Sequence, residues 1–223
     1  MSKIEITREL AAKVLNVVDA GLSIGRGRSE PGHMCVEAAV CFALGLPHSD
    51  KPPCVAAVVR DIKVHINDCG GWESGSRRAA GLRRLAIAQL GSVDIDIKAF
   101  IKMFNAMLVQ EIIPMSFNIE PMPADPEKLL EILNAKTLNI ANKDEYMDCD
   151  HVLRLVYQTM KFDVGDNRIG NWVCIIDNLF HRLGVTTEKL RPVRTRLCEA
   201  IVEILIELKS PGCDFLDLAP KPT

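Results

Sequence analysis

The sequence predicts an all-α protein. Three observations point to this class: apolar residues recur at helical spacing, glycine and proline separate these stretches, and aromatic residues make up only 5% of the 223 residues. A core with few aromatic residues must be aliphatic, which favours packed helices over an aromatic-rich sandwich. We therefore expect roughly nine helices in an irregular bundle, with no convincing sheet.

The first half of the chain contains five of the expected helices. Residues 54–67 fit a helical stripe, although Ile62, Val64 and Ile66 also alternate as in a strand. We favour the helix there because no partner strand is evident nearby. The five helices are expected at 7–22, 31–45, 54–67, 77–90 and 95–113.

A proline-rich stretch, PMSFNIEPMPADP, then interrupts the helical pattern. It predicts a boundary between an N-terminal half at 1–119 and a C-terminal half at 125–210, with one compact domain as the alternative. Residues 211–223 are expected to form an extended tail. Four helices are expected in the second half, at 125–135, 149–161, 170–183 and 192–209, the first opened by an Asp-Pro pair.

Composition and charge narrow the function classes. A net charge of −2 gives no global bias toward nucleic acid or anionic membrane. The first ten residues, MSKIEITREL, lack the apolar core of a signal peptide, and no apolar run has the length of a membrane span. The eight cysteines form no CxxC pair and are expected to be reduced thiols. These features predict a cytoplasmic protein that uses no cofactor and does not bind a membrane.

The expected helix at 31–45 is almost wholly apolar, yet it carries His33, Cys35 and Glu37. A helix that is apolar on all sides is normally buried. A carboxylate or an imidazole inside such a helix is costly unless it is paired. We therefore expect His33 and Glu37 to be buried, with Glu37 paired to an arginine of the 77–84 stretch.

Cys35 is a candidate nucleophile because it lies close to the start of this helix, where the helix dipole stabilises a thiolate. A thiol-dependent hydrolase would also need a histidine base within hydrogen-bond reach. Two positions along a helix correspond to about 200° of rotation, so His33 would point away from Cys35. The base would have to be a distant histidine such as His48, and a structural cysteine is the favoured interpretation.

A metal site is a second interpretation of this helix. His33, Glu37 and Cys41 are spaced by four residues, as ligands on one helix face are. However, Cys41 would lie two turns from His33, too far to share one ion with it. No metal site is therefore expected.

The stretch at 67–84 combines an aromatic residue with a group of arginines. Tryptophan and arginine are the commonest hot spots of protein interfaces, so this stretch is the expected partner-binding surface. Nucleic-acid binding is an alternative, but the arginines would spread over both sides of a helix and no wider basic surface is evident. The residues concerned are Trp72, Glu73, Arg77, Arg78, Arg83 and Arg84.

A glycine-rich stretch, GLSIGRGR, precedes the apolar helix. Such a loop before a helix can cradle an anion, and Arg26 and Arg28 would add affinity. It follows a helix rather than a strand and lacks the Lys-Ser/Thr pair of a P-loop. A helix end followed by a flexible connector is the favoured interpretation.

The runs EPGHMCVEAAVCFALGLPH and GLRRLAIAQLGS resemble a family of uncharacterised bacterial and phage proteins, over about residues 20–92. The resemblance implies a prokaryotic or phage origin and carries no activity with it. We expect a cytosolic interaction protein that binds a protein or nucleoprotein complex in bacterial or phage defence or regulation. The alternatives are a thiol-dependent hydrolase using Cys35 and a helical nucleic-acid-binding protein.

Overall fold

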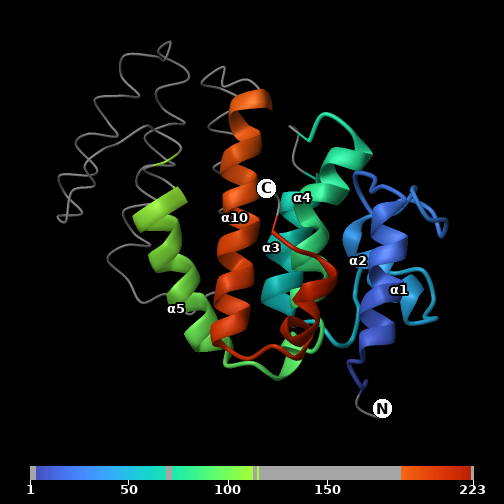
Figure 1. The fold of residues 1–223 in the computed structure, drawn as a ribbon, viewed down its shortest axis with the longest axis horizontal. Coiled ribbons are helices and arrows are strands. Elements are labelled where there is room, and N and C mark those ends of the chain that lie inside the picture. The colour runs from blue at the N-terminus through green and yellow to red at the C-terminus, as the bar shows by residue number, and fades with distance from the viewer. Residues whose placement is uncertain (1–3, 69–71, 113–114, 116–186, 222–223) are drawn as a thin grey trace.

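The computed structural model describes residues 4–68, 72–112, 115 and 187–221 (Figure 1). These residues are mostly helical and include no strand, which confirms the predicted all-α class for the described part of the chain. An isolated antiparallel bridge joins Gly27 and Met34. No helix among the described residues is long and apolar enough to cross a membrane.

The described ranges contain seven helices of α or π type, rather than the nine expected for the whole chain. Three of the nine, at 125–135, 149–161 and 170–183, lie outside the described residues. Two 3-10 segments, η1 and η3, complete the fold. The elements are α1 (Arg8–Asp19), α2 (Val36–Ala43), α3 (Ala57–Asp68), α4 (Gly75–Ala88), η1 (Ser92–Asp94), α5 (Ile97–Met107), the π-helix η2 (Leu108–Ile112), α10 (Thr187–Glu207) and η3 (Pro211–Leu218).

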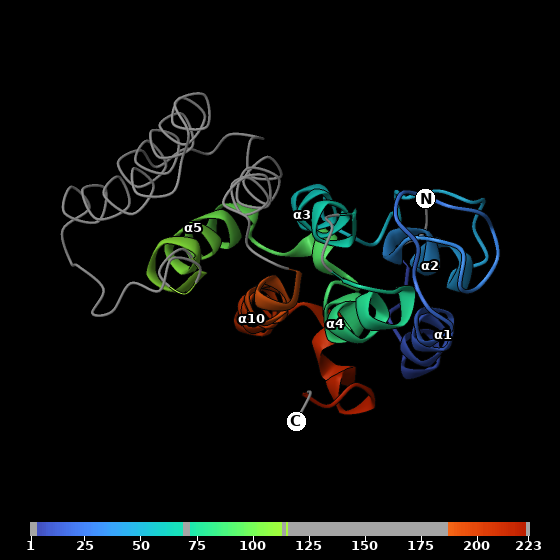
Figure 2. The ribbon, with the colours of Figure 1, turned by 90° about the horizontal axis from the view of Figure 1, so that it is seen from above.

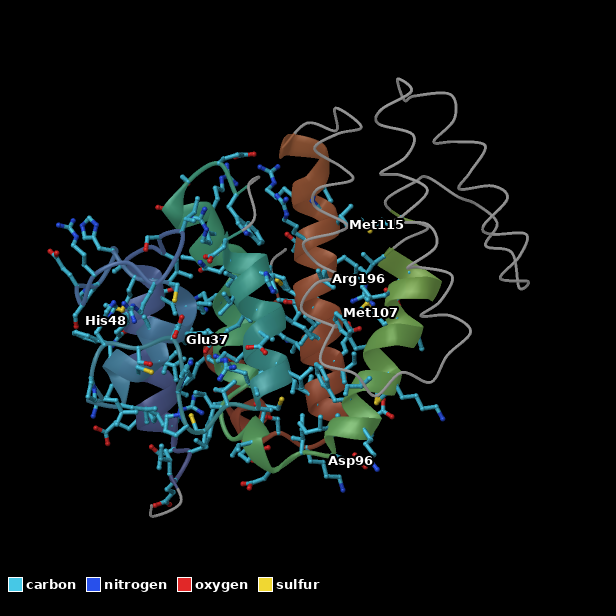
Figure 3. The ribbon with its side chains drawn as sticks, turned by 180° about the vertical axis from the view of Figure 1, so that it is seen from behind. Glu37, His48, Asp96, Met107, Met115 and Arg196 are labelled. Carbon is cyan, nitrogen blue, oxygen red and sulfur yellow. The ribbon has the colours of Figure 1, made fainter. Side chains whose placement is uncertain are left out.

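Side-chain caps explain where several helices begin. Thr7 Oγ1 accepts a hydrogen bond from the Leu10 amide, and Ser74 Oγ accepts one from the Arg77 amide. Asp96 Oδ1 accepts from two amides at the start of α5 (Figure 3). Each cap satisfies an amide that has no partner within its own helix. The predicted helix at 54–67 is confirmed as α3, and its strand alternative is wrong.

Helix α4 lies at the centre of the described fold, between α1 and α10 (Figure 2). Its last turn is buried on all sides, because the four residues 85–88 are each shielded from solvent. Helix α5 lies beyond α10, and Arg196 of α10 is 2.6 Å from Glu111 of η2 (Figure 3). One hydrophobic core therefore joins the described parts of the two predicted halves, while the predicted boundary between them lies outside the described residues.

The chain after α10 folds back onto α4 instead of forming the extended tail that the sequence predicted. Ser210 Oγ donates to the Ala88 carbonyl at 2.7 Å, and the Gly212 amide donates to the Leu90 carbonyl at 2.8 Å. Gly212 lies so close to the Ile87 carbonyl that a Cβ atom would clash with it. These contacts hold residues Pro211–Leu218 as η3 against the end of α4.

Candidate functional site

Glu37 of α2 and Lys63 of α3 form an ion pair in the core. Lys63 Nζ lies 3.0 Å from Glu37 Oε1, and both side chains are fully buried. Gln89, at the end of α4, donates from Nε2 to Glu37 Oε2 at 3.3 Å. Burial of Glu37 is thus confirmed, but the expected arginine partner is wrong. The cation comes from α3 because the four arginines at 77–84 are directed elsewhere.

This ion pair lies in an environment that is costly for charge. Burial raises the pKa of Glu37 and lowers the pKa of Lys63, while the charge of each partner opposes that shift in the other. Beyond the ion pair, the Lys63 ammonium has no hydrogen-bond acceptor among the described residues, and Gln89 Oε1 has no donor there. Each charge therefore depends on the other for its compensation.

His33 is exposed, so its predicted burial is wrong. Helix α2 begins at Val36 rather than near residue 31, and His33 lies in the turn before it, where Gly32 has a φ of +85°. His33 and Glu37 therefore do not share a helix face. Within the part of the chain that the structure describes, no group of three or more histidine, cysteine or acidic side chains could hold a metal ion.

Cys35 is the N-cap of α2, and its Sγ accepts a hydrogen bond from the Ala38 amide at 3.4 Å. The thiol is buried, and burial raises its pKa, which is opposite to the shift that a nucleophilic cysteine needs. His48 Nε2 is hydrogen-bonded to the Gly27 carbonyl at 3.1 Å rather than to Cys35. The geometry gives no support to a Cys35–His48 dyad.

Trp72 is only 1% exposed, so it cannot act as the surface anchor that the sequence predicted. Its Nε1 donates to the Ile66 carbonyl at 2.7 Å, which satisfies the indole inside the core. Its ring lies against Gly81 of α4, where a Cβ atom would clash with it. Trp72 is therefore a core residue that packs α4 against the end of α3.

Three of the four arginines stabilise the fold. Arg78 is buried and donates to the Asn67 carbonyl at 2.7 Å and the Leu22 carbonyl at 3.0 Å. Arg83 pairs with Asp19 of α1, and Arg84 pairs with Glu199 of α10. The last two also donate to carbonyls at the end of η3, those of Leu218 and Ala219.

Arg77 differs from its neighbours because its side chain is largely exposed. Its Nε lies 3.9 Å from Glu73, which also pairs with Arg191 of α10 at 3.1 Å. Glu73 itself has a φ of +58°, an uncommon conformation for a residue with a side chain. Of the predicted partner-binding residues, Arg77 and Glu73 are the two that are exposed, while Arg83 is half-buried in its pair with Asp19.

Backbone hydrogen bonds close the largely exposed loop at residues 23–34, which we call the hairpin loop. Its two sides run antiparallel and are joined by backbone hydrogen bonds: the Ser23 amide donates to the Met34 carbonyl at 2.9 Å, and the Arg28 amide donates to the His33 carbonyl at 2.7 Å. Gly27 has a φ of +67°, and the His33 backbone lies where its Cβ would be. Glycine at this position permits the close approach of the two sides.

Polar residues of α3 and α4 fix this loop to the core, and two of them, Asn67 and Arg78, are buried. Asn67 donates from Nδ2 to the Ser23 carbonyl at 2.9 Å and accepts from the Val36 amide at 3.3 Å. Asp68 accepts from the Gly25 amide at 2.8 Å. Arg78 donates to the carbonyl of Leu22, the residue before the loop. The sequence predicted a flexible connector here. The side chains that fix the loop lie some forty residues further along the chain, so local sequence patterns do not reveal them.

The hairpin loop presents one apolar side chain and two basic ones to solvent. Ile24 is 61% exposed, the largest exposed fraction among the described large hydrophobic residues. Arg26 and Arg28 follow it and are also exposed.

Comparison of the chain with protein-family models, curated proteins and solved structures finds no match. The resemblance to bacterial and phage proteins therefore stays a prediction, and the site must be interpreted from its own chemistry.

Proposed function

We propose that this protein binds a partner protein through the hairpin loop. The observation that carries the proposal is that buried polar side chains serve an exposed loop. Asn67 is fully buried and Arg78 nearly so, and desolvating such groups is costly unless they are hydrogen-bonded. Arg78 donates to the Leu22 carbonyl just before the loop, and Asn67 bonds to the Ser23 carbonyl at its start and to the Val36 amide just after its end. The core thus fixes a surface loop that contributes few side chains to the core itself.

A fixed loop is suited to binding because less conformational entropy is lost when a partner docks. Ile24 supplies an apolar contact, and Arg26 and Arg28 supply hydrogen-bond donors for acidic groups. The start of α4 adjoins the N-terminal end of the loop, since the Gly75 carbonyl accepts from the Leu22 amide at 3.2 Å. The complementary partner has an apolar depression flanked by acidic side chains.

A protein partner is favoured over direct binding of nucleic acid. The basic side chains of this surface are few, and Glu30 and Glu73 lie close to them along the chain. Nucleic-acid binding usually needs a larger basic patch together with aromatic side chains that stack on bases. Trp72, the aromatic residue nearest the arginines in sequence, is buried. A protein that belongs to a nucleoprotein complex remains compatible with this surface.

The test is site-specific photo-crosslinking. A photoreactive phenylalanine derivative is placed at Ile24 in the full-length protein, and a control protein carries it at Ile206, an exposed isoleucine of α10. Both are irradiated in extract of the natural host, with and without nuclease. We expect a nuclease-resistant protein adduct at position 24 that is absent at position 206. Equal adducts at both positions, or adducts lost on nuclease treatment, would contradict the proposal.

The identified partner then allows a quantitative check. Ile24→Ser and the double change Arg26→Ala/Arg28→Ala should each weaken its binding by roughly tenfold or more, as truncation of a hot spot does. Ile206→Ser is the matched control and should leave the affinity unchanged. All three changes lie on exposed side chains, so the fold should be preserved. Wild-type affinity in the Ile24 variant would overturn the proposal.

A further inference from the structure

A concave site lies away from the hairpin loop. It is a half-open pocket of about 890 Å³, within the range of about 300–1,000 Å³ typical of small-molecule sites. Four chain segments that are distant in the sequence build it: the N-terminal stretch before α1, the loop after α2, the turn containing η1, and the start of η3. These segments gather at the lower end of the bundle in Figure 1.

The floor of the pocket is mainly apolar. Cys54 and Gly91 are buried there, and the Cys54 carbonyl accepts a hydrogen bond from the Val93 amide at 3.3 Å. Burial raises the pKa of the Cys54 thiol, so it stays neutral. Ile4 and Ile6 are half-buried among the lining residues. A ligand would therefore place its apolar part on this floor.

The mouth of the pocket has a different character. Leu46 and Val93 are 37% and 50% exposed there, which leaves apolar surface open to solvent. Glu5 and Asp94 also line the pocket, and both are exposed. No lysine or arginine lines it among the described residues. The site thus runs from an apolar floor to a mouth that carries carboxylates.

We infer that this pocket binds a small amphiphile with an apolar body and a cationic head. The apolar body would cover the floor and the exposed Leu46 and Val93. The cation would lie at the mouth near the Glu5 carboxylate, where both charges stay partly hydrated. A fatty acid with an apolar chain of the same length as the amphiphile would place its carboxylate beside that of Glu5. Repulsion between the two negative charges would disfavour its binding. This inference uses none of the residues of the hairpin loop and is independent of the proposed function.

The test compares three probes that share one eight-carbon chain: octylamine, octanol and octanoate. Binding to the full-length protein is measured by calorimetry. We expect octylamine to bind saturably and about fivefold more tightly than octanol, the ratio that one carboxylate near an ammonium gives in water, with octanoate weakest. Glu5→Gln should remove the preference for octylamine over octanol and leave octanol binding unchanged.

Two further variants locate the site. Leu46→Asn should weaken the binding of octylamine and octanol alike, whereas Ile206→Asn on α10 should change neither. Unchanged far-ultraviolet circular dichroism confirms that each variant is folded. Absence of saturable octylamine binding to the wild-type protein would overturn the inference. So would equal or tighter binding of octanoate, or equal losses in the Leu46 and Ile206 variants.

Discussion

Lys63 Nζ lies 3.0 Å from Glu37 Oε1 in a core where neither side chain is exposed. This pair links α2 to α3, and Gln89 extends the link to the end of α4. Removing one partner leaves an uncompensated buried charge, whereas replacing both leaves a hydrophobic contact. Replacing one residue of the pair should therefore change the free energy of unfolding differently from replacing both.

Lys63→Met should lower the free energy of unfolding by about 3–5 kcal/mol, because Glu37 would be left buried without its cation. The double variant Glu37→Leu/Lys63→Met should recover most of this loss, since both charges are gone. Urea denaturation of the single and double variants measures the difference. A double variant as unstable as the single one would show that the core needs the charges themselves.

The stability loss in Lys63→Met should depend on pH. Burial raises the pKa of Glu37, and in this variant the lowering effect of Lys63 is removed. A group whose folded-state pKa is raised stabilises the fold below its unfolded pKa, and this contribution disappears as pH rises through the folded pKa. The loss relative to wild type should therefore be smaller at about pH 5 than at about pH 8. A loss of stability that is independent of pH would mean that the buried charge of Glu37 is not its cause.

Arg84 and Arg77 lie on the same helix but should differ in their contribution to stability. Arg84→Met removes hydrogen bonds to Glu199 and to the Ala219 carbonyl, both donated by a charged group, and should cost about 2–3 kcal/mol. Arg77→Met removes a long, exposed pair with Glu73 and should cost less than about 0.5 kcal/mol. Thermal unfolding measured side by side separates them, and equal losses would contradict the assignment.

Asn67 should control the order of the hairpin loop. Asn67→Ala removes the donor to the Ser23 carbonyl and the acceptor for the Val36 amide. Hydrogen exchange within residues 23–36 should accelerate, while the amides of α10 should be unaffected. Asp61→Ala, on the exposed side of α3, is the control and should leave exchange in the hairpin loop unchanged. Faster exchange throughout the protein would indicate global destabilisation instead.

Cys35 should react slowly with iodoacetamide at neutral pH, because burial raises its pKa and its Sγ is engaged by the Ala38 amide. Mass spectrometry of peptides containing Cys35 gives its alkylation rate in folded and in urea-unfolded protein. Alkylation of Cys35 should be slower in the folded protein than in the unfolded protein. A faster rate in the folded protein would restore the hydrolase alternative.

Much of the fold could be predicted from local patterns. Apolar spacing located α1, α3, α4 and the last helix, since a helix records its buried face in residues three and four apart. The start of α2 was missed because Pro31 and Gly32 belong to a turn, and the true cap is a cysteine rather than a common capping residue. The tail was missed because η3 depends on its contacts with α4.

The sequence by itself determined the helical class and the burial of Glu37, because both follow from patterns within a few residues. Only the tertiary structure decided where polar side chains point. Lys63 pairs with Glu37 across two helices, Arg84 reaches a carbonyl group 135 residues away, and Asn67 fixes a loop 44 residues before it. Such partners depend on how helices pack, and side-chain direction at a given sequence position is set by that packing rather than by the neighbours in the chain.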